Sequence, residues 1–231
     1  MAVCYDKWTV LKHRPIARLA PNLWRVAGVM EGGTKRVMSL VRLQDGRVLL
    51  HNAIALDEAE MAEIDAWGDV AGILVPNAFH RMDARIMQAR YPKARVFCPA
   101  NATKAVKKAT EVHGSFADAP GDATVRVRHL AGVGENEGVV EVDGPEGTSL
   151  VFNDMFLNMP AMGLPMDLLL GPTGRSSVPR FARWFFVKDK AAFRQDLDRL
   201  AGLSPVRAIP GHGEDVVDGV ADQLIAAAAL V

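Results

Sequence analysis

Two polar side chains of the sequence each follow an apolar run that has the pattern of a buried strand. His212 stands between two glycines at the end of one run, and Asp154 ends another. An imidazole on such a tight turn, or a carboxylate at a strand end, can bind a metal ion or accept a proton. Each also has a structural explanation, since a turn histidine can bond only to the backbone and an aspartate can cap a helix. The two residues are therefore candidates for a site.

A third segment adds a pair of candidates. His80 and Asp83 follow the apolar run 72–75 and stand three residues apart, so at the start of a helix they would lie on one face. Such a pair is common by chance. All three segments, however, come after the carboxyl end of a predicted strand, where open α/β sheets gather their ligand sites. We therefore expect all four candidates to lie near one another.

Predicted strands and helices follow one another in the order of a layered α/β protein. Alternating and β-branched apolar residues predict strands at 23–27, 37–43, 48–51, 72–75, 95–98, 125–128, 138–142, 149–152 and 206–209. Helical spacing and capping residues predict helices at 57–67, 82–90, 101–114 and 189–200, and one that begins near 216. Asp57, with Glu60 three residues later, has the pattern of a capping box. The order predicts a sandwich in two similar halves.

The composition is that of a soluble globular chain. The sequence has 231 residues, of which 49% are apolar and 23% are charged, and 27 basic side chains balance 27 acidic ones. A neutral chain has no overall field to attract nucleic acid or an anionic membrane, and no apolar run approaches the roughly 20 residues of a membrane span. We expect neither partner, and instead a small-molecule substrate or ligand. The sequence does not predict the oligomeric state.

The cysteines and the N-terminus predict a cytoplasmic protein. Cys4 and Cys98 belong to no Cys-x-x-Cys motif, and two unpaired thiols are expected in preference to a disulfide. The first residues lack the pattern of a secretion signal. We expect one domain over residues 1–231, with an irregular N-terminal arm at 1–20 and a long loop at 160–180 that is rich in Pro, Gly and Ser.

Three arginines lie in and after this loop. Arg175, Arg180 and Arg183 precede the aromatic segment Trp184–Phe186. They could bind an anion, or they could form a solvated basic face above aromatic side chains that anchor the core. The pattern favours the second interpretation.

The order of these segments resembles the metallo-β-lactamase fold superfamily. The segments that carry the likeness, within residues 20–225, are Leu23–Val26, Val48–Asn52, Ile73–His80, Tyr91–Phe97, Leu150–Asp154 and Ile209–Gly213. The resemblance implies a four-layer αββα sandwich, in which helices flank two mixed sheets and a metal site lies at the sheet edge. More narrowly, Val75-Pro-Asn-x-x-His80 resembles a little-characterised branch with a degenerate metal-binding motif.

The metal motif departs from the pattern of that superfamily. The family carries a His-x-His-x-Asp-His segment, a later Pro-Gly-His, a strand-end aspartate and a final histidine. No alignment of the first segment with residues 77–84 gives more than two ligands, and an aliphatic residue near Val133 replaces the histidine of Pro-Gly-His. A full dinuclear centre cannot be built from this set. The best case that the resemblance implies retains His80, Asp83, Asp154 and His212 as metal ligands.

Two hypotheses stay open. In the first, the protein is a metal-dependent hydrolase with a reduced mononuclear site, in which these residues hold one divalent ion (zinc, manganese or iron) and the bound water attacks an ester, thioester or similar bond. In the second, the protein is a metal-free, non-catalytic small-molecule binding or interaction protein on the same fold. Both require Asp154 and His212 to converge at one rim of a sheet.

Overall fold

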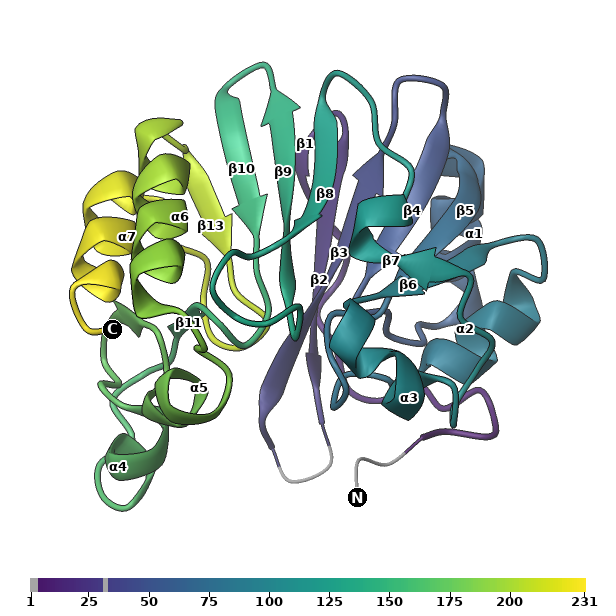
Figure 1. The fold of residues 1–231 in the computed structure, drawn as a ribbon. Coiled ribbons are helices and arrows are strands. Elements are labelled where there is room, and N and C mark those ends of the chain that lie inside the picture. The colour runs from purple at the N-terminus through teal and green to yellow at the C-terminus, as the bar shows by residue number, and fades with distance from the viewer. Residues whose placement is uncertain (1–3, 31–32) are drawn as a thin grey trace.

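The computed structural model describes residues 4–30 and 33–231, and two facing β-sheets form its centre (Figure 1). The first sheet has seven strands in chain order: β1 (Ala17–Ala20), β2 (Leu23–Val29), β3 (Lys35–Arg42), β4 (Arg47–His51), β5 (Asp69–Leu74), β6 (Arg95–Cys98) and β7 (Gly114–Ser115). Strands β1 to β4 pair antiparallel, and β4 to β7 pair parallel. The sheet is therefore mixed, as predicted.

Four strands form the second sheet, in the order β13 (Arg207–Ile209), β10 (Gly147–Val151), β9 (Gly138–Gly144) and β8 (Val125–His129). Strands β8, β9 and β10 pair antiparallel, whereas β13 pairs with β10 in parallel. In that parallel pair, the last residues of the two strands, Val151 and Ile209, lie opposite each other. The segments that follow β10 and β13 therefore leave the sheet at the same edge.

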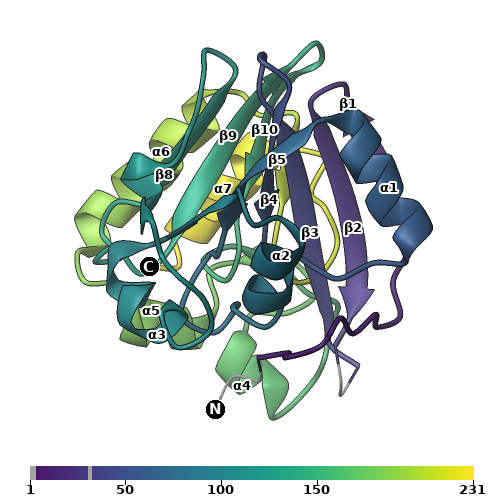
Figure 2. The same ribbon diagram turned by 90° about the vertical axis from the view of Figure 1, so that its right-hand side faces the viewer.

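Helices cover the outer faces of both sheets. The first sheet carries α1 (Glu58–Trp67), α2 (Ala84–Arg90) and α3 (Thr103–Val106), and the second carries α6 (Lys190–Gly202) and α7 (Val220–Ala228) (Figure 1, Figure 2). This arrangement is the predicted αββα sandwich.

Alternation of side chains along the strands builds a separate apolar core between each pair of layers. In β3, Met38 and Leu40 pack toward the helices of the first layer, whereas Val37 and Val41 pack between the two sheets. A further core, which includes Leu150 of β10, lies between the second sheet and its helices. Because apolar side chains point alternately to the two faces of each strand, both faces of the sheets are buried, and this gives the layered fold.

Two predicted helices have different bounds in the structure. The helix predicted at 101–114 is wrong in its second half: a 3₁₀ turn at Ala100–Ala102 leads into α3, and β7 follows. Strand β7 extends the sheet beside β6, which requires extended backbone where the sequence pattern predicted helix. The last helix begins at Val220, because Val216 instead pairs with Ala208.

Helix α1 begins after Asp57 as predicted, but the expected capping box does not form. Asp57 makes no side-chain cap bond. Its carboxylate and that of Glu60 instead lie 3.8 and 3.4 Å from Nε2 of His13. A partner from the N-terminal segment, more than 40 residues away in the sequence, thus takes the place of the local bond.

Short elements occur in both segments that were expected to be irregular. The predicted arm, residues 1–20, ends in β1, which pairs with β2; its residues 1–3 lie outside the described residues. The predicted loop at 160–180 contains a short helix and a two-residue strand. These elements are α4 (Met166–Leu170) and β12 (Ser176–Ser177), and β12 pairs with β11 (Leu157–Asn158).

The aromatic segment after the loop anchors the core only in part. Trp184 and Phe185, at the end of α5 (Arg180–Phe185), are 66% and 65% exposed, whereas Phe186 is partly buried and packs against the core of the second sheet and its helices. Arg180 and Arg183 donate hydrogen bonds to backbone carbonyls of α4 and of the C-terminal end. These two arginines thus hold neighbouring segments together.

Two other expectations concern the cysteines and the membrane. Cys4 and Cys98 are free thiols, as predicted. Within the described residues, the structure contains no helix with the length and apolar character needed to cross a bilayer.

Candidate metal centre

The carboxyl ends of β10 and β13 position two of the candidate ligands. Asp154 and His212 each stand three residues beyond the paired strand ends Val151 and Ile209, so the parallel register brings both side chains to one place. His80 reaches the same place from the first sheet, in the segment between β5 and α2. The three side chains come from distant parts of the chain and meet where the two sheets end.

Three predicted ligands form a close group. Nε2 of His80 lies 3.2 Å from Nε2 of His212 and 3.3 Å from Oδ2 of Asp154, and Nε2 of His212 lies 3.4 Å from Oδ1 of Asp154. The group is largely buried. A tetrahedral ion bound at about 2.0–2.1 Å needs ligand atoms about 3.3 Å apart. The separation of the two Nε2 atoms matches that requirement, and each imidazole lies at a similar distance from one of the two oxygens of Asp154.

Hydrogen bonds from outside the group determine which ring nitrogens face its centre. Nδ1 of His212 donates to the carbonyl oxygen of Lys35 over 2.6 Å. The amide of Asn52 donates to the carbonyl of Val37, so its Oδ1 is an acceptor for Nδ1 of His80 at 3.1 Å. Both imidazoles therefore carry a proton on Nδ1 and present Nε2 to the centre, which is the arrangement of metal-binding histidines.

The charges of the group are strongly coupled. Burial favours a neutral Asp154, but His80 and His212 outweigh it and hold the pKa of this carboxyl well below 3.8. Burial lowers the pKa of His80. Burial has the same effect on His212, yet the hydrogen bond and charge of Asp154 overcome it and raise the pKa of His212 above 6.5. Without a metal ion, His212 therefore binds a proton more readily than His80.

A buried polar network supports Asp154 from behind. The amide nitrogen of Asn77 donates to Oδ2 of Asp154 over 2.7 Å and to Oε2 of Glu137 over 3.1 Å. The other oxygen of Glu137 accepts from the backbone nitrogen of Met155 over 2.7 Å. Burial, together with the charge of Asp154, raises the pKa of Glu137 to about 8, so this side chain is mostly protonated at neutral pH. The network holds Asp154 in one orientation.

The fourth predicted ligand, Asp83, does not join the group. Its Oδ1 accepts a hydrogen bond from the backbone nitrogen of Ala55 over 3.1 Å, and its Oδ2 forms an ion pair with Arg36. Both side chains of this pair are almost completely buried. The helical spacing from His80 does not apply, because α2 begins only at Ala84. Asp83 therefore has a structural partner in this fold.

A second group of possible ligands lies at the start of α1. It consists of His13, Asp57 and Glu60. The side chain of Asp57 is 72% exposed. This group is the natural comparison for any test of metal binding.

The coordinates match solved metallo-β-lactamases over nearly the whole chain. A crystal structure of DIM-1 metallo-β-lactamase superposes with a TM-score of 0.62 at 12% identity, and DIM-1 exposed to ceftazidime gives 0.59 at 15%. A structure of VMB-1 at pH 5.5 gives 0.59 at 12%. Each match covers 96% of this chain and 99% of the other. No protein-family model and no curated protein matches the sequence.

The chain has the metallo-β-lactamase fold. This confirms the fold that the resemblance implied. At 12–15% identity the likeness concerns the fold, and the chemistry has to be inferred from the residues of this chain.

Within this metallo-β-lactamase fold, an apolar cavity of about 280 Å³ opens beside the candidate metal centre. Asp154 and His212 contribute polar atoms to its wall. The rest of the wall is mainly hydrocarbon, and the side chains that form it include Phe79, Leu157, Met159, Leu170 and Phe181. Its wall comes from several segments of the chain, which the fold brings together at this place.

His51, at the end of β4, makes the stability of this metallo-β-lactamase fold depend on pH. It is buried, and its Nε2 has no hydrogen-bond partner among the described residues. Burial, with a contribution from His80, lowers its pKa from 6.5 to about 3. The unfolded chain therefore binds a proton at His51 that the folded chain excludes, and stability falls as the pH drops below about 6.5.

We expect His51 alone to lower the free energy of unfolding of the metal-free protein by about 2 kcal/mol between pH 7 and pH 5. Urea unfolding at the two pH values measures this difference. In His51→Gln, which cannot titrate, the difference between the two pH values should shrink by about this amount. An unchanged difference would show that His51 is not the cause.

Proposed function

We propose that this protein is a hydrolase that uses one divalent metal ion held by His80, Asp154 and His212. The observation that supports this most is the geometry of the group: the two Nε2 atoms lie 3.2 Å apart, each lies 3.3–3.4 Å from one carboxylate oxygen of Asp154, and one ligand atom from each residue lies within 4.8 Å of the others. Two imidazoles and one carboxylate are a common ligand set of hydrolytic zinc sites. Iron and manganese also accept such ligands, so the identity of the ion is left to analysis.

A single ion fits the residues better than a pair. Asp83, which a second ion would need, is bound to Arg36 and to the backbone of Ala55. Among the described residues, the group around His80 contains three ligands. We therefore propose a mononuclear centre, reduced relative to the dinuclear pattern of the superfamily.

The residues around the centre have separate roles in the proposed reaction. When bound, a divalent ion in such a site supplies an activated water molecule near neutral pH and polarises a carbonyl oxygen. His80 and His212 keep Nε2 toward the centre through Asn52 and the carbonyl of Lys35. Asp154 provides the negative charge that favours a cation there. The substrate is a small molecule with an ester, thioester or similar bond.

Elemental analysis of protein purified without chelator tests the proposal, together with hydrolysis assays. We expect close to one equivalent of zinc, iron or manganese per chain and hydrolysis that stops when a chelator removes the ion. A metal-free preparation that regains no metal on addition, yet still binds a small molecule, would favour the alternative of a non-catalytic binding protein.

The affinity for metal should depend on pH. Because the pKa of His212 lies above 6.5 in the metal-free protein, the ion has to displace a proton from Nε2 of this residue. The apparent affinity should therefore fall about tenfold for each pH unit below that raised pKa, a fall that begins above pH 6.5. Competition titrations with a metal indicator at several pH values measure it, and a flat profile down to pH 6.5 would contradict the assigned proton.

A further inference from the structure

The apolar cavity beside the metal centre indicates the class of substrate. Asp154 and His212 are at its wall, so a group bound in the cavity lies next to the ligands of the proposed ion. Leu157 is buried, and Leu170 and Phe181 line the cavity from α4 and α5. A polar group placed there would lose its water and find few hydrogen-bond partners.

The size of the cavity limits the length of the group that it can hold. A volume of about 280 Å³ equals that of roughly nine water molecules at about 30 Å³ each, and a methylene group occupies a similar volume. An unbranched chain of roughly six to ten carbons therefore fills it. Hydrocarbon of this length gains affinity from burial alone.

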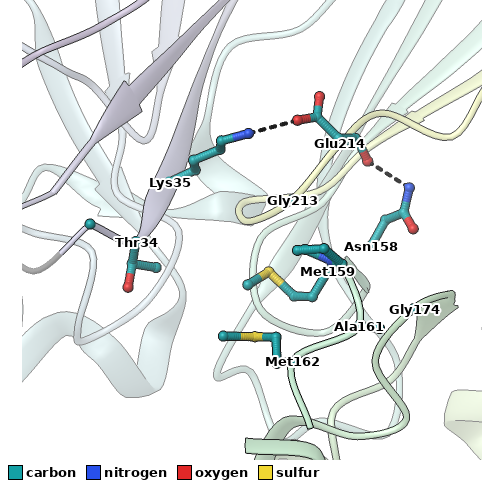
Figure 3. Close-up of a pocket in the computed structure, with 11 residues that line it drawn as sticks. Thr34, Lys35, Asn158, Met159, Ala161, Met162, Gly174, Gly213 and Glu214 are labelled. Carbon is teal, nitrogen blue, oxygen red and sulfur yellow. Dashed lines mark hydrogen bonds and ion pairs between the residues drawn. The ribbon is translucent and has the colours of Figure 1, made fainter.

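A second, larger cavity offers room for the other half of the substrate. It has a volume of about 730 Å³ and shares the lining residues Thr34 and Met159 with the first, so the two cavities are adjacent. Figure 3 shows Met159 and Met162 on one side of this cavity and Thr34 on the other. At its edge, Nζ of Lys35 pairs with Glu214 over 2.9 Å, which gives this part a polar wall that the first cavity lacks.

We propose that the enzyme hydrolyses esters or thioesters of medium-length fatty acids, with the acyl chain in the apolar cavity and the alcohol or thiol in the larger one. This inference rests on the proposed function. In the reaction, water adds to the carbonyl carbon and the bond from that carbon to oxygen or sulfur breaks. The acid takes the hydroxyl group and the leaving alcohol or thiol takes the proton, so one water molecule is consumed.

A series of 4-nitrophenyl esters, from acetate to dodecanoate, tests the chain length with metal-loaded protein. We expect kcat/KM to rise about three- to fourfold per methylene, equivalent to roughly 0.8 kcal/mol each, and to level off at roughly six to ten carbons. Leu170→Asn, which places an amide in the cavity, should flatten this rise. Leu170→Trp, which fills part of the cavity, should move the optimum to shorter chains.

Leu168→Asn is the matched control, because Leu168 lies on the same helix but is 58% exposed and does not line the cavity. It should keep the chain-length profile of the natural protein. Hydrolysis with a flat profile, or equal effects of the two Asn variants, would overturn the inference and leave the proposed function intact.

Binding of octanoate, followed by calorimetry, separates this inference from the function. The acyl cavity is supported if octanoate binds the natural protein and binds Leu170→Asn at least tenfold more weakly. If octanoate binds in this way but no ester is hydrolysed, the acyl cavity stands and the hydrolase function is overturned. Octanoate that fails to bind, or that binds both proteins equally, counts against the acyl cavity whatever the hydrolysis assay gives.

Discussion

Asp154→Asn is expected to lose the metal ion and, with it, hydrolysis. The carboxylate is the only negative charge in the group of three ligands, and its pKa lies so far below 3.8 that it is ionised throughout the neutral range. An amide of the same shape removes this charge and turns one oxygen into an N–H donor that faces the imidazoles. We expect the affinity for metal to fall by more than the roughly 10–100-fold that a change outside the ligand shell causes.

A titration with a competing chelator measures the affinity, and elemental analysis measures the metal content of the purified variant. Circular dichroism confirms that the variant is folded. The matched control is Asp57→Asn in the exposed group His13, Asp57 and Glu60, which should keep the metal content of the natural protein. The opposite pattern, with metal lost in Asp57→Asn and kept in Asp154→Asn, would place the ion at the surface group.

The position of Asp154 and His212 could be predicted because it depends on local patterns. Each residue follows an apolar run, and runs of that kind form strands whose carboxyl ends hold ligands. The sequence does not show that Val151 and Ile209 pair in parallel; the structure does, and this pairing brings Asp154 and His212 together. The strands themselves were predictable for the same reason, since alternation of apolar residues is itself the consequence of two-sided packing.

Residues that act through distant partners could not be predicted. Glu137 precedes a strand and has the sequence environment of a surface residue, yet it is buried against Asn77. Asn52 has a positive φ of 55° and orients His80 from 28 residues away in the chain. Neither residue belongs to a sequence pattern that would indicate its role in the site. The partner of such a residue is determined by how the two sheets face each other, and that is a property of the whole fold.

The same reason explains why the partners of Asp83, Arg36 and Ala55, could not be predicted from the sequence. The buried pair with Arg36 leads to a large expected effect on stability. Arg36→Met should lower the free energy of unfolding by about 3–5 kcal/mol, because it leaves the carboxylate of Asp83 buried without its counter-charge. Urea unfolding at pH 7 measures this. Metal content should stay near that of the natural protein in Asp83→Asn, in which the side-chain oxygen can still accept from Ala55.

Two further variants separate the buried pair from ion pairs in general. The double variant Arg36→Met, Asp83→Leu removes both charges, so it should recover part of the stability that Arg36→Met loses, although the bond to Ala55 stays broken. Arg47→Met breaks the exposed pair with Asp45 and should cost only about 0–1 kcal/mol. Equal losses in Arg36→Met and Arg47→Met would show that burial does not strengthen the pair between Arg36 and Asp83. Metal loss in Asp83→Asn would return Asp83 to the metal centre.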